Sequence, residues 1–186
     1  DHLVDLILRT NRLGVKNADL FMYISEAGNE VDLKAEHINQ YIRASSGEGF
    51  TAKNFRTWAA THRCAERLAF LAQPQTANDM IHWLGKLPGV ESIDKLWTGG
   101  DWAVPTTQFE RNKTMLAVID TVAADLGNTR PVCRSSYIHP WFLNAWMEKR
   151  LLETWNDFAS MRRISGLSAG ESSTLRVLKH LRKESR

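Results

Sequence analysis

Apolar residues recur at the three- and four-residue spacing of amphipathic helices along most of this chain. The longest such pattern follows Thr51, whose hydroxyl can cap a helix over residues 52–72. The apolar stripe of this helix is broad: Phe55, Trp58, Ala59, Cys64, Leu68 and Leu71. A stripe of that width predicts a central helix of the core.

Shorter patterns predict three elements before it. A short amphipathic helix around residues 3–8 ends before Gly14, and weak alternation around Gly28 indicates a small hairpin or extended segment. A further helix is predicted over residues 34–44. That helix is expected to bury three side chains: Ile38, Tyr41 and Ile42.

Helix-start signals mark the second half of the chain. Thr107 and Glu110 have capping-box spacing before a helix over residues 108–126, which Gly127 ends. Pro131 opens a short helix that carries residues 133–137.

Two more helices follow. One begins at Pro140 and is expected to run to about Phe158. Ser168 and Glu171 form another capping-box pair before a basic terminal helix.

Residues 74–106 differ from the rest, with three prolines, the turn signal Gly99-Gly100 and the tryptophans Trp83, Trp97 and Trp102. We interpret this segment as a partly helical insertion that packs on the surface of the main domain. The summed prediction is a mainly α fold with at most a minor β element, in one domain over residues 1–186.

Composition narrows the class of protein. Apolar residues make up 43% of the chain and charged residues 24%, as in globular domains. No apolar run reaches the roughly 18 residues of a membrane span, so we expect a cytoplasmic protein without membrane contact. Residues 134–186 carry ten Lys/Arg against five Asp/Glu, whereas residues 1–50 carry five against eight. This bias is typical of a polyanion-binding surface, although a solvated helical face gives the same count.

The sequence predicts no metal site, no nucleotide-binding site and no disulfide. Cys64 and Cys133 lie far apart and lack zinc-ligand spacing, so two reduced thiols are expected. No phosphate-binding glycine loop, histidine cluster or Gly-x-Ser-x-Gly motif occurs. We therefore expect no metal and no other cofactor.

Tyr137, in "CRSSYIHP", is the candidate nucleophile. A phenol is a weak nucleophile at neutral pH unless cations or hydrogen-bond donors stabilise the phenolate. Arg134 lies one helical turn upstream, Arg56 lies near the start of the long helix, and Asn128 lies in a turn nine residues before the tyrosine. Arginine grips phosphate oxygens and an amide donates to them, so the set suits phosphodiester cleavage. Taken singly, each residue type more often has a structural role.

Two segments in this order resemble the poxvirus-like branch of type IB DNA topoisomerases, which includes many bacterial members. "FTAKNFRTWAAT" (50–61) resembles the family's A-K-D-[FL]-R-T-[WY] segment. "LGNT" (126–129) and "CRSSYIHP" (133–140) resemble its L-G-[HN]-T and S-Y pair, with the nine-residue gap preserved. The resemblance covers residues 1–73 and 107–165.

The resemblance implies the helical catalytic domain shared by type IB topoisomerases and tyrosine recombinases, acting as a monomer on double-stranded DNA in a bacterial nucleoid. Tyr137 would attack a phosphodiester and form a 3′-phosphotyrosyl link. The strand with the free 5′-hydroxyl would rotate and then reseal, without ATP. Arg56 would hold a phosphate oxygen, and Asn128 would donate where poxvirus members have histidine. Lys53 and Arg134 would contact DNA.

The same resemblance implies two more catalytic residues, an arginine and a general-acid lysine on a β-hairpin. In family members both lie upstream of the part of the sequence to which residue 1 of this chain corresponds. The family's clamp domain lies there too. We therefore expect an N-terminally truncated catalytic domain that relaxes DNA poorly or not at all alone.

Two alternatives stay open at this point. A tyrosine recombinase shares the chemistry but usually has His-x-x-Arg where this chain has Lys53-Asn54-Phe55-Arg56. A non-catalytic DNA-binding or partner-binding helical domain would use the tryptophans of residues 74–106 as an interface, and exposed aromatic side chains would favour it.

Overall fold

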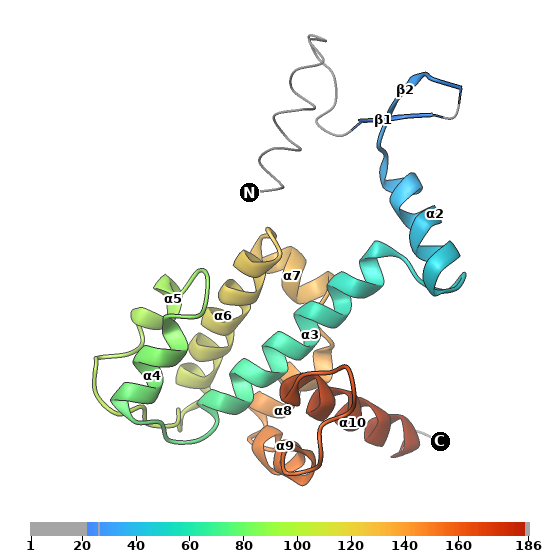
Figure 1. Ribbon diagram of the computed structural model, residues 1–186. Helices are drawn as coiled ribbons and strands as arrows, with labels where there is room; N and C mark the ends of the chain where they lie inside the picture. Colours follow the sequence, from blue (N-terminus) through green and yellow to red (C-terminus); the bar gives the residue numbers. More distant parts are fainter. Residues whose placement is uncertain (1–21, 26, 185–186) are drawn as a thin grey trace. The chain divides into compact units, whose positions relative to one another are not determined.

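The computed structural model describes residues 22–25 and 27–184, which are coloured in Figure 1. The chain divides into two compact units, Asp1–Asn54 and Phe55–Arg186. The short helix predicted around residues 3–8 lies outside the described residues.

The first unit contains the predicted hairpin. Strands β1 (Met22–Ile24) and β2 (Glu30–Asp32) pair antiparallel, with Tyr23 opposite Val31. The turn between them uses Gly28 at a φ of 79°, a left-handed conformation that suits glycine. Helix α2 (Ala35–Ser46) follows close to its predicted bounds.

The burial predicted for α2 is wrong. Tyr41 is 73% exposed, Ile38 is also exposed, and Ile42 is only half-buried. The described part of this unit offers only a two-stranded hairpin, which is too small to cover an amphipathic helix. The periodicity of residues 34–44 correctly indicated a helix with an apolar face, but it did not show whether another element covers that face.

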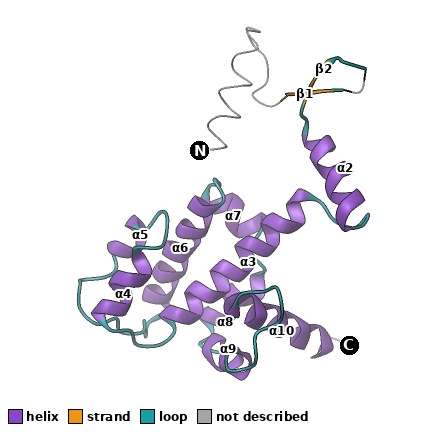
Figure 2. Cartoon of the chain, in the orientation of Figure 1, coloured by secondary structure: helices purple, strands orange, loops and turns teal. Residues whose placement is uncertain are grey.

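The second unit is helical, as Figure 2 shows, so the mainly α prediction is confirmed. Its first helix, α3, begins in the first unit at Ala52 and ends at Leu71. The others are α4 (Ala77–Leu84), α5 (Glu91–Asp94), α6 (Gln108–Asp125), α7 (Arg130–Ser136), α8 (Pro140–Met147), α9 (Leu151–Ala159) and α10 (Ala169–Glu184).

Helices α3 and α6 supply much of the core. In Figure 1, α4 and α5 lie on the same side of α3 as α6, and α9 and α10 lie on the other. Cys64 and Leu68 of α3 are buried together with Val118 and Val122 of α6. The prediction that Phe55 belongs to this core is wrong: its side chain is 53% exposed, because the buried residues of α3 begin only at Ala60.

Residues 74–106 contribute to the same core. Met80, Ile93 and Trp102 are buried in it, and the indole N–H of Trp102 donates to the Leu71 carbonyl over 3.0 Å. Close packing also explains Gly89, because a Cβ there would lie 2.7 Å from the Cβ of Ala124. The segment is therefore integrated into the unit; that it is an insertion stays a prediction.

Both predicted capping boxes form. The Thr107 hydroxyl accepts from the Glu110 N–H over 3.2 Å, and the Glu110 carboxylate accepts from the Thr107 N–H over 3.1 Å. Ser168 and Glu171 make the same pair of bonds, over 3.1 and 2.8 Å, at the start of α10. These local side-chain pairs fix where α6 and α10 begin.

The single helix predicted from Pro140 to Phe158 is wrong, since α8 and α9 are separate. Lys149, at a φ of 65°, ends α8. Its N–H donates to Trp146, and the Arg150 N–H donates to Ala145 over 3.0 Å, which is a Schellman ending with lysine in the position that glycine usually takes. The Arg111 guanidinium also donates to the Trp146 carbonyl and so stabilises this break.

No helix in the described part of the chain is long and apolar enough to cross a membrane.

Candidate active site

Three of the predicted site residues come together in the second unit. Arg56 lies on α3, Asn128 in the turn after α6, and Tyr137 at the end of α7. Nη2 of Arg56 donates to Oδ1 of Asn128 over 3.0 Å. The Arg56 Cζ lies 5.4 Å from the centroid of the Tyr137 ring. An arginine, an amide and a phenol thus converge from segments far apart in the sequence.

The turn at residues 126–128 holds the arginine. Gly127 adopts a φ of 62°, and the Asn128 N–H donates to the Ala123 carbonyl over 2.8 Å, which closes the end of α6. The same turn directs the Leu126 carbonyl toward Arg56, whose Nη2 donates to it over 2.8 Å. The "LGNT" sequence therefore ends a helix and also presents two oxygens to one guanidinium.

The amide orientation of Asn128 follows from its partner. A guanidinium has no acceptor, so the amide oxygen must face Arg56 and the NH₂ group must point elsewhere. That nitrogen, Nδ2, is buried and has no hydrogen-bond partner among the described residues. A buried donor without a partner costs free energy, and an anionic oxygen that reached it would remove that cost. Because protein atoms cover Nδ2, such an oxygen needs a local displacement to reach it.

Arg56 keeps its charge available. Within the described part of the chain it forms no ion pair with a carboxylate, and both of its hydrogen-bond acceptors are uncharged oxygens. Arg63 and Arg67 on the same helix instead share the Asp125 carboxylate. The positive charge of Arg56 is thus free to act on an anion.

Tyr137 is half-buried and closes α7, where its N–H donates to the Cys133 carbonyl over 3.2 Å. The Tyr137 carbonyl accepts from the hydroxyl of Thr61, which lies on the same helix as Arg56. Thr61 is not among the residues predicted from the motifs. The only signal for it in the sequence is its place at the end of the arginine segment.

Neither of the two predicted DNA contacts takes part in the hydrogen bonds described above. Lys53 is exposed and belongs to the first unit. Arg134 is exposed on α7 and forms no ion pair within the described residues. It lines a cavity of about 580 Å³ together with Arg130 and Asn144.

Two titratable groups near Tyr137, the Cys133 thiol and the His139 ring, are uncharged at neutral pH and do not act as nucleophiles in place of the phenol. Burial raises the pKa of the Cys133 thiol to about 11, although Arg56 acts in the opposite direction, so the thiol stays protonated at neutral pH. Burial lowers the pKa of His139. Nδ1 of His139 accepts from the Trp141 N–H over 3.3 Å, so this histidine caps α8 as a neutral ring.

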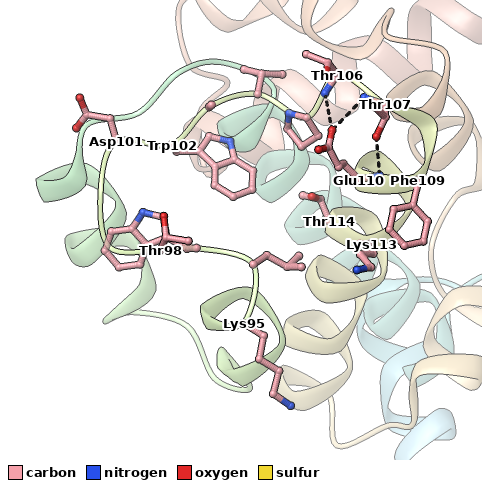
Figure 3. Close-up of a pocket in the computed structure, with 15 residues that line it drawn as sticks. Lys95, Thr98, Asp101, Trp102, Thr106, Thr107, Phe109, Glu110, Lys113 and Thr114 are labelled. Atoms are coloured by element: carbon pink, nitrogen blue, oxygen red, sulfur yellow. Dashed lines mark hydrogen bonds between the residues drawn. The ribbon is translucent and has the colours of Figure 1, made fainter.

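A hollow of about 650 Å³ lies elsewhere, among residues 95–114 (Figure 3). Trp102, Phe109 and Lys113 line it, and its Glu110 carboxylate is occupied by the backbone N–H groups of the Thr107 cap. None of the predicted site residues lines it. No metal-binding cluster of three or more His, Cys, Asp or Glu occurs among the described residues.

Residues 8–150 match the family described as eukaryotic DNA topoisomerase I, catalytic core. This chain belongs to that family of type IB topoisomerases. The matched region of this topoisomerase catalytic core contains Arg56, Asn128 and Tyr137. The family prediction is therefore confirmed, and DNA is the substrate that the family implies. No curated protein matches the chain. Assignment of this topoisomerase to the poxvirus-like and bacterial branch stays a prediction.

Proposed function

We propose that this chain cleaves and rejoins one strand of double-stranded DNA as a monomeric type IB topoisomerase of the poxvirus-like branch, with Tyr137 as the nucleophile. The observation that carries the proposal is the convergence of three residues: an arginine with no carboxylate partner among the described residues, an amide with a buried and unpartnered donor, and a tyrosine. The match of residues 8–150 to the topoisomerase family supports it.

In the proposed reaction, the Tyr137 oxygen attacks a backbone phosphorus and loses its proton as the new O–P bond forms. The bond from phosphorus to the 5′-oxygen breaks, and that oxygen leaves as a hydroxyl after taking up a proton. The free strand rotates about its partner and relieves supercoiling. The 5′-hydroxyl then attacks the phosphotyrosyl phosphorus and restores both starting groups, so no ATP is consumed.

Arg56 and Asn128 would stabilise the charge that builds up on the non-bridging phosphate oxygens. Fixed donors act best when they are already ordered before the transition state, because no reorganisation is then needed. Two bonds to the turn at residues 126–128 hold the guanidinium in place. The Asn128 Nδ2 is the second donor in this proposal, after the local displacement that lets a phosphate oxygen reach it.

The leaving 5′-oxygen needs an acid, which the family resemblance assigns to a lysine upstream of the motifs. Within the described part of the second unit, no lysine bonds to Tyr137 or stacks on its ring. Loss of a general acid typically slows a reaction by about 10²–10⁴-fold. We therefore propose that a substrate whose leaving group needs no acid is cleaved faster than ordinary DNA.

Covalent capture tests the proposal. The chain is incubated in EDTA with a suicide duplex whose short downstream fragment, which carries the new 5′-hydroxyl, diffuses away after cleavage. A denaturing gel is then examined for an adduct absent from Tyr137→Phe. A second duplex with sulfur at the 5′-bridging position supplies a leaving group that needs no acid. We expect little adduct with the oxygen substrate and more with the sulfur substrate. A folded, DNA-bound chain that forms no adduct with either substrate would refute the assignment of Tyr137.

A further inference from the structure

Thr61 makes two hydrogen bonds to the segment that carries Tyr137. Its side chain is buried, at 3% exposure, on α3. Oγ1 donates to the Tyr137 carbonyl over 3.1 Å and accepts from the His139 N–H over 3.1 Å. A hydroxyl has one donor and two acceptor positions, so one threonine satisfies both backbone groups at once.

These two bonds lie on either side of a short link between helices. Tyr137 closes α7, and His139 caps α8. Ile138 between them is buried, and its N–H donates to the Cys133 carbonyl over 3.2 Å. Thr61 thus holds the first and third residues of the link, while the core holds the second.

The same helix also carries the charge next to the phenol. Arg56, five residues before Thr61 on α3, lies over the Tyr137 ring. Because α3 is a rigid helix that carries both Arg56 and Thr61, it fixes the guanidinium next to the ring and the backbone of Tyr137 relative to each other.

We propose that Thr61 is a positioning residue for strand cleavage, which sets the place of the Tyr137 backbone relative to Arg56. The inference rests on the proposed function, since it requires Tyr137 to be the nucleophile. A misplacement of about 1 Å can slow an oriented reaction by about 10²-fold. Removal of the Thr61 hydroxyl frees both ends of the link and permits such a shift.

The test compares Thr61→Val, which removes the hydroxyl at similar volume, with Thr61→Ser, which keeps it. Single-turnover adduct formation is measured at saturating DNA, with the sulfur-bridged substrate. We expect Thr61→Val to slow adduct formation by about 10- to 100-fold with unchanged DNA affinity, and Thr61→Ser to remain within about threefold of the unsubstituted chain. Thr61→Ala serves as a second hydroxyl-free variant if the valine does not fold.

Thr174→Val is the matched control. Thr174 is fully buried on α10, and within the described part of the chain its hydroxyl bonds only to the Gly170 carbonyl of its own helix. A general loss of stability would slow both valine variants, whereas a positioning role slows only Thr61→Val and is rescued by serine. Amide hydrogen exchange at His139 adds a readout independent of chemistry: it should accelerate in Thr61→Val and stay slow in Thr61→Ser and Thr174→Val.

The two proposals fail in different ways. Absence of an adduct from the unsubstituted chain refutes Tyr137 as nucleophile, and the positioning role with it. An adduct from the unsubstituted chain and an equal rate from folded Thr61→Val refute the positioning role alone. Unchanged exchange at His139 in Thr61→Val does the same.

Discussion

The guanidinium of Arg56 lies over the ring of Tyr137, with Cζ 5.4 Å from the ring centroid. The arginine reaches this place while bonded to the two oxygens of the turn at residues 126–128. A cation over an aromatic face is favourable by itself, and in the proposed reaction the same cation would also hold the phosphate that the phenol attacks.

Arg56→Lys and Arg56→Ala should both slow adduct formation, by about 10²–10³-fold for alanine. Lysine should rescue little, because an ammonium cannot bond the turn and grip phosphate oxygens with the planar donor fork of a guanidinium. Single-turnover cleavage with the sulfur-bridged substrate measures the effect. Arg63→Lys, on the same helix but paired with Asp125, is the control and should cleave normally. Normal cleavage by Arg56→Lys would contradict the assigned role.

Substitutions of Asn128 can separate its two functions. Asn128→Asp keeps an acceptor for Arg56 but loses the Nδ2 donor, so we expect a folded chain with strongly reduced cleavage. Asn128→His supplies a ring N–H and should retain more cleavage than Asn128→Asp or Asn128→Ala. Thermal unfolding checks the fold of each variant. Equal cleavage by the aspartate and histidine variants would exclude donation by residue 128.

Lys53 and Arg134 should contribute to DNA affinity through phosphates. Lys53→Gln and Arg134→Gln should each weaken binding and reduce the slope of log affinity against log salt by about one. Titration of a labelled duplex at several salt concentrations measures both quantities. Lys86→Gln, an exposed substitution after α4, is the control. An unchanged slope in either variant would remove that residue from the interface.

Stability should fall as the pH drops below the ordinary histidine pKa of 6.5. Burial lowers the pKa of His62, with the Glu171 carboxylate opposing this, and burial also lowers the pKa of His139. Between 6.5 and these lower values the unfolded chain binds more protons than the folded chain, so the free energy of unfolding decreases with decreasing pH. Denaturant unfolding at pH 7.5 and 5.5 tests this.

In the same experiment, His62→Gln should lose less stability on acidification than the unsubstituted chain. His82→Gln, at an exposed position on α4, should behave like the unsubstituted chain. An identical pH dependence in His62→Gln would show that His62 is not responsible.

Trp102 should hold residues 74–106 in the core. Trp102→Phe leaves the Leu71 carbonyl without its donor and should cost about 1–3 kcal/mol. Trp102→Ala should cost about 3–5 kcal/mol and expose the segment to proteases. Trp97→Phe is the control, because among the described residues the Trp97 indole N–H bonds only to the exposed Gly100 carbonyl. Rapid cleavage within residues 74–106 of the unsubstituted chain would contradict this packing.

The starts of α6 and α10 were predicted correctly from the sequence, because a capping box is formed by two side chains only three residues apart. The break between α8 and α9 escaped prediction since Lys149 occupies a position that usually requires glycine, and its stabilisation comes from Arg111 on another helix. The prediction that Tyr41 is buried failed for a different reason. Periodicity shows that a helix has an apolar face, but it does not show which element covers that face.

The sequence predicts those residues of the candidate site that belong to a recognisable motif. The order and spacing of the two segments single out Arg56, Asn128 and Tyr137, although their catalytic roles stay predictions. Thr61 was not predictable in this way. Its partners are backbone atoms of residues 76 and 78 positions away, and backbone atoms leave no signature in the side-chain pattern.

The short link between α7 and α8 also has a mechanical consequence. In the proposed reaction, one end of the cleaved strand is attached to Tyr137 while its free 5′-hydroxyl end turns about the intact strand, so drag on the DNA pulls on residues 137–139. Thr61 ties both ends of that link to α3, the longest described helix, and Ile138 anchors its middle in the core. In that reaction the tension would be spread over packed helices instead of a loose loop, and the proposed phosphotyrosyl group would stay aligned for resealing.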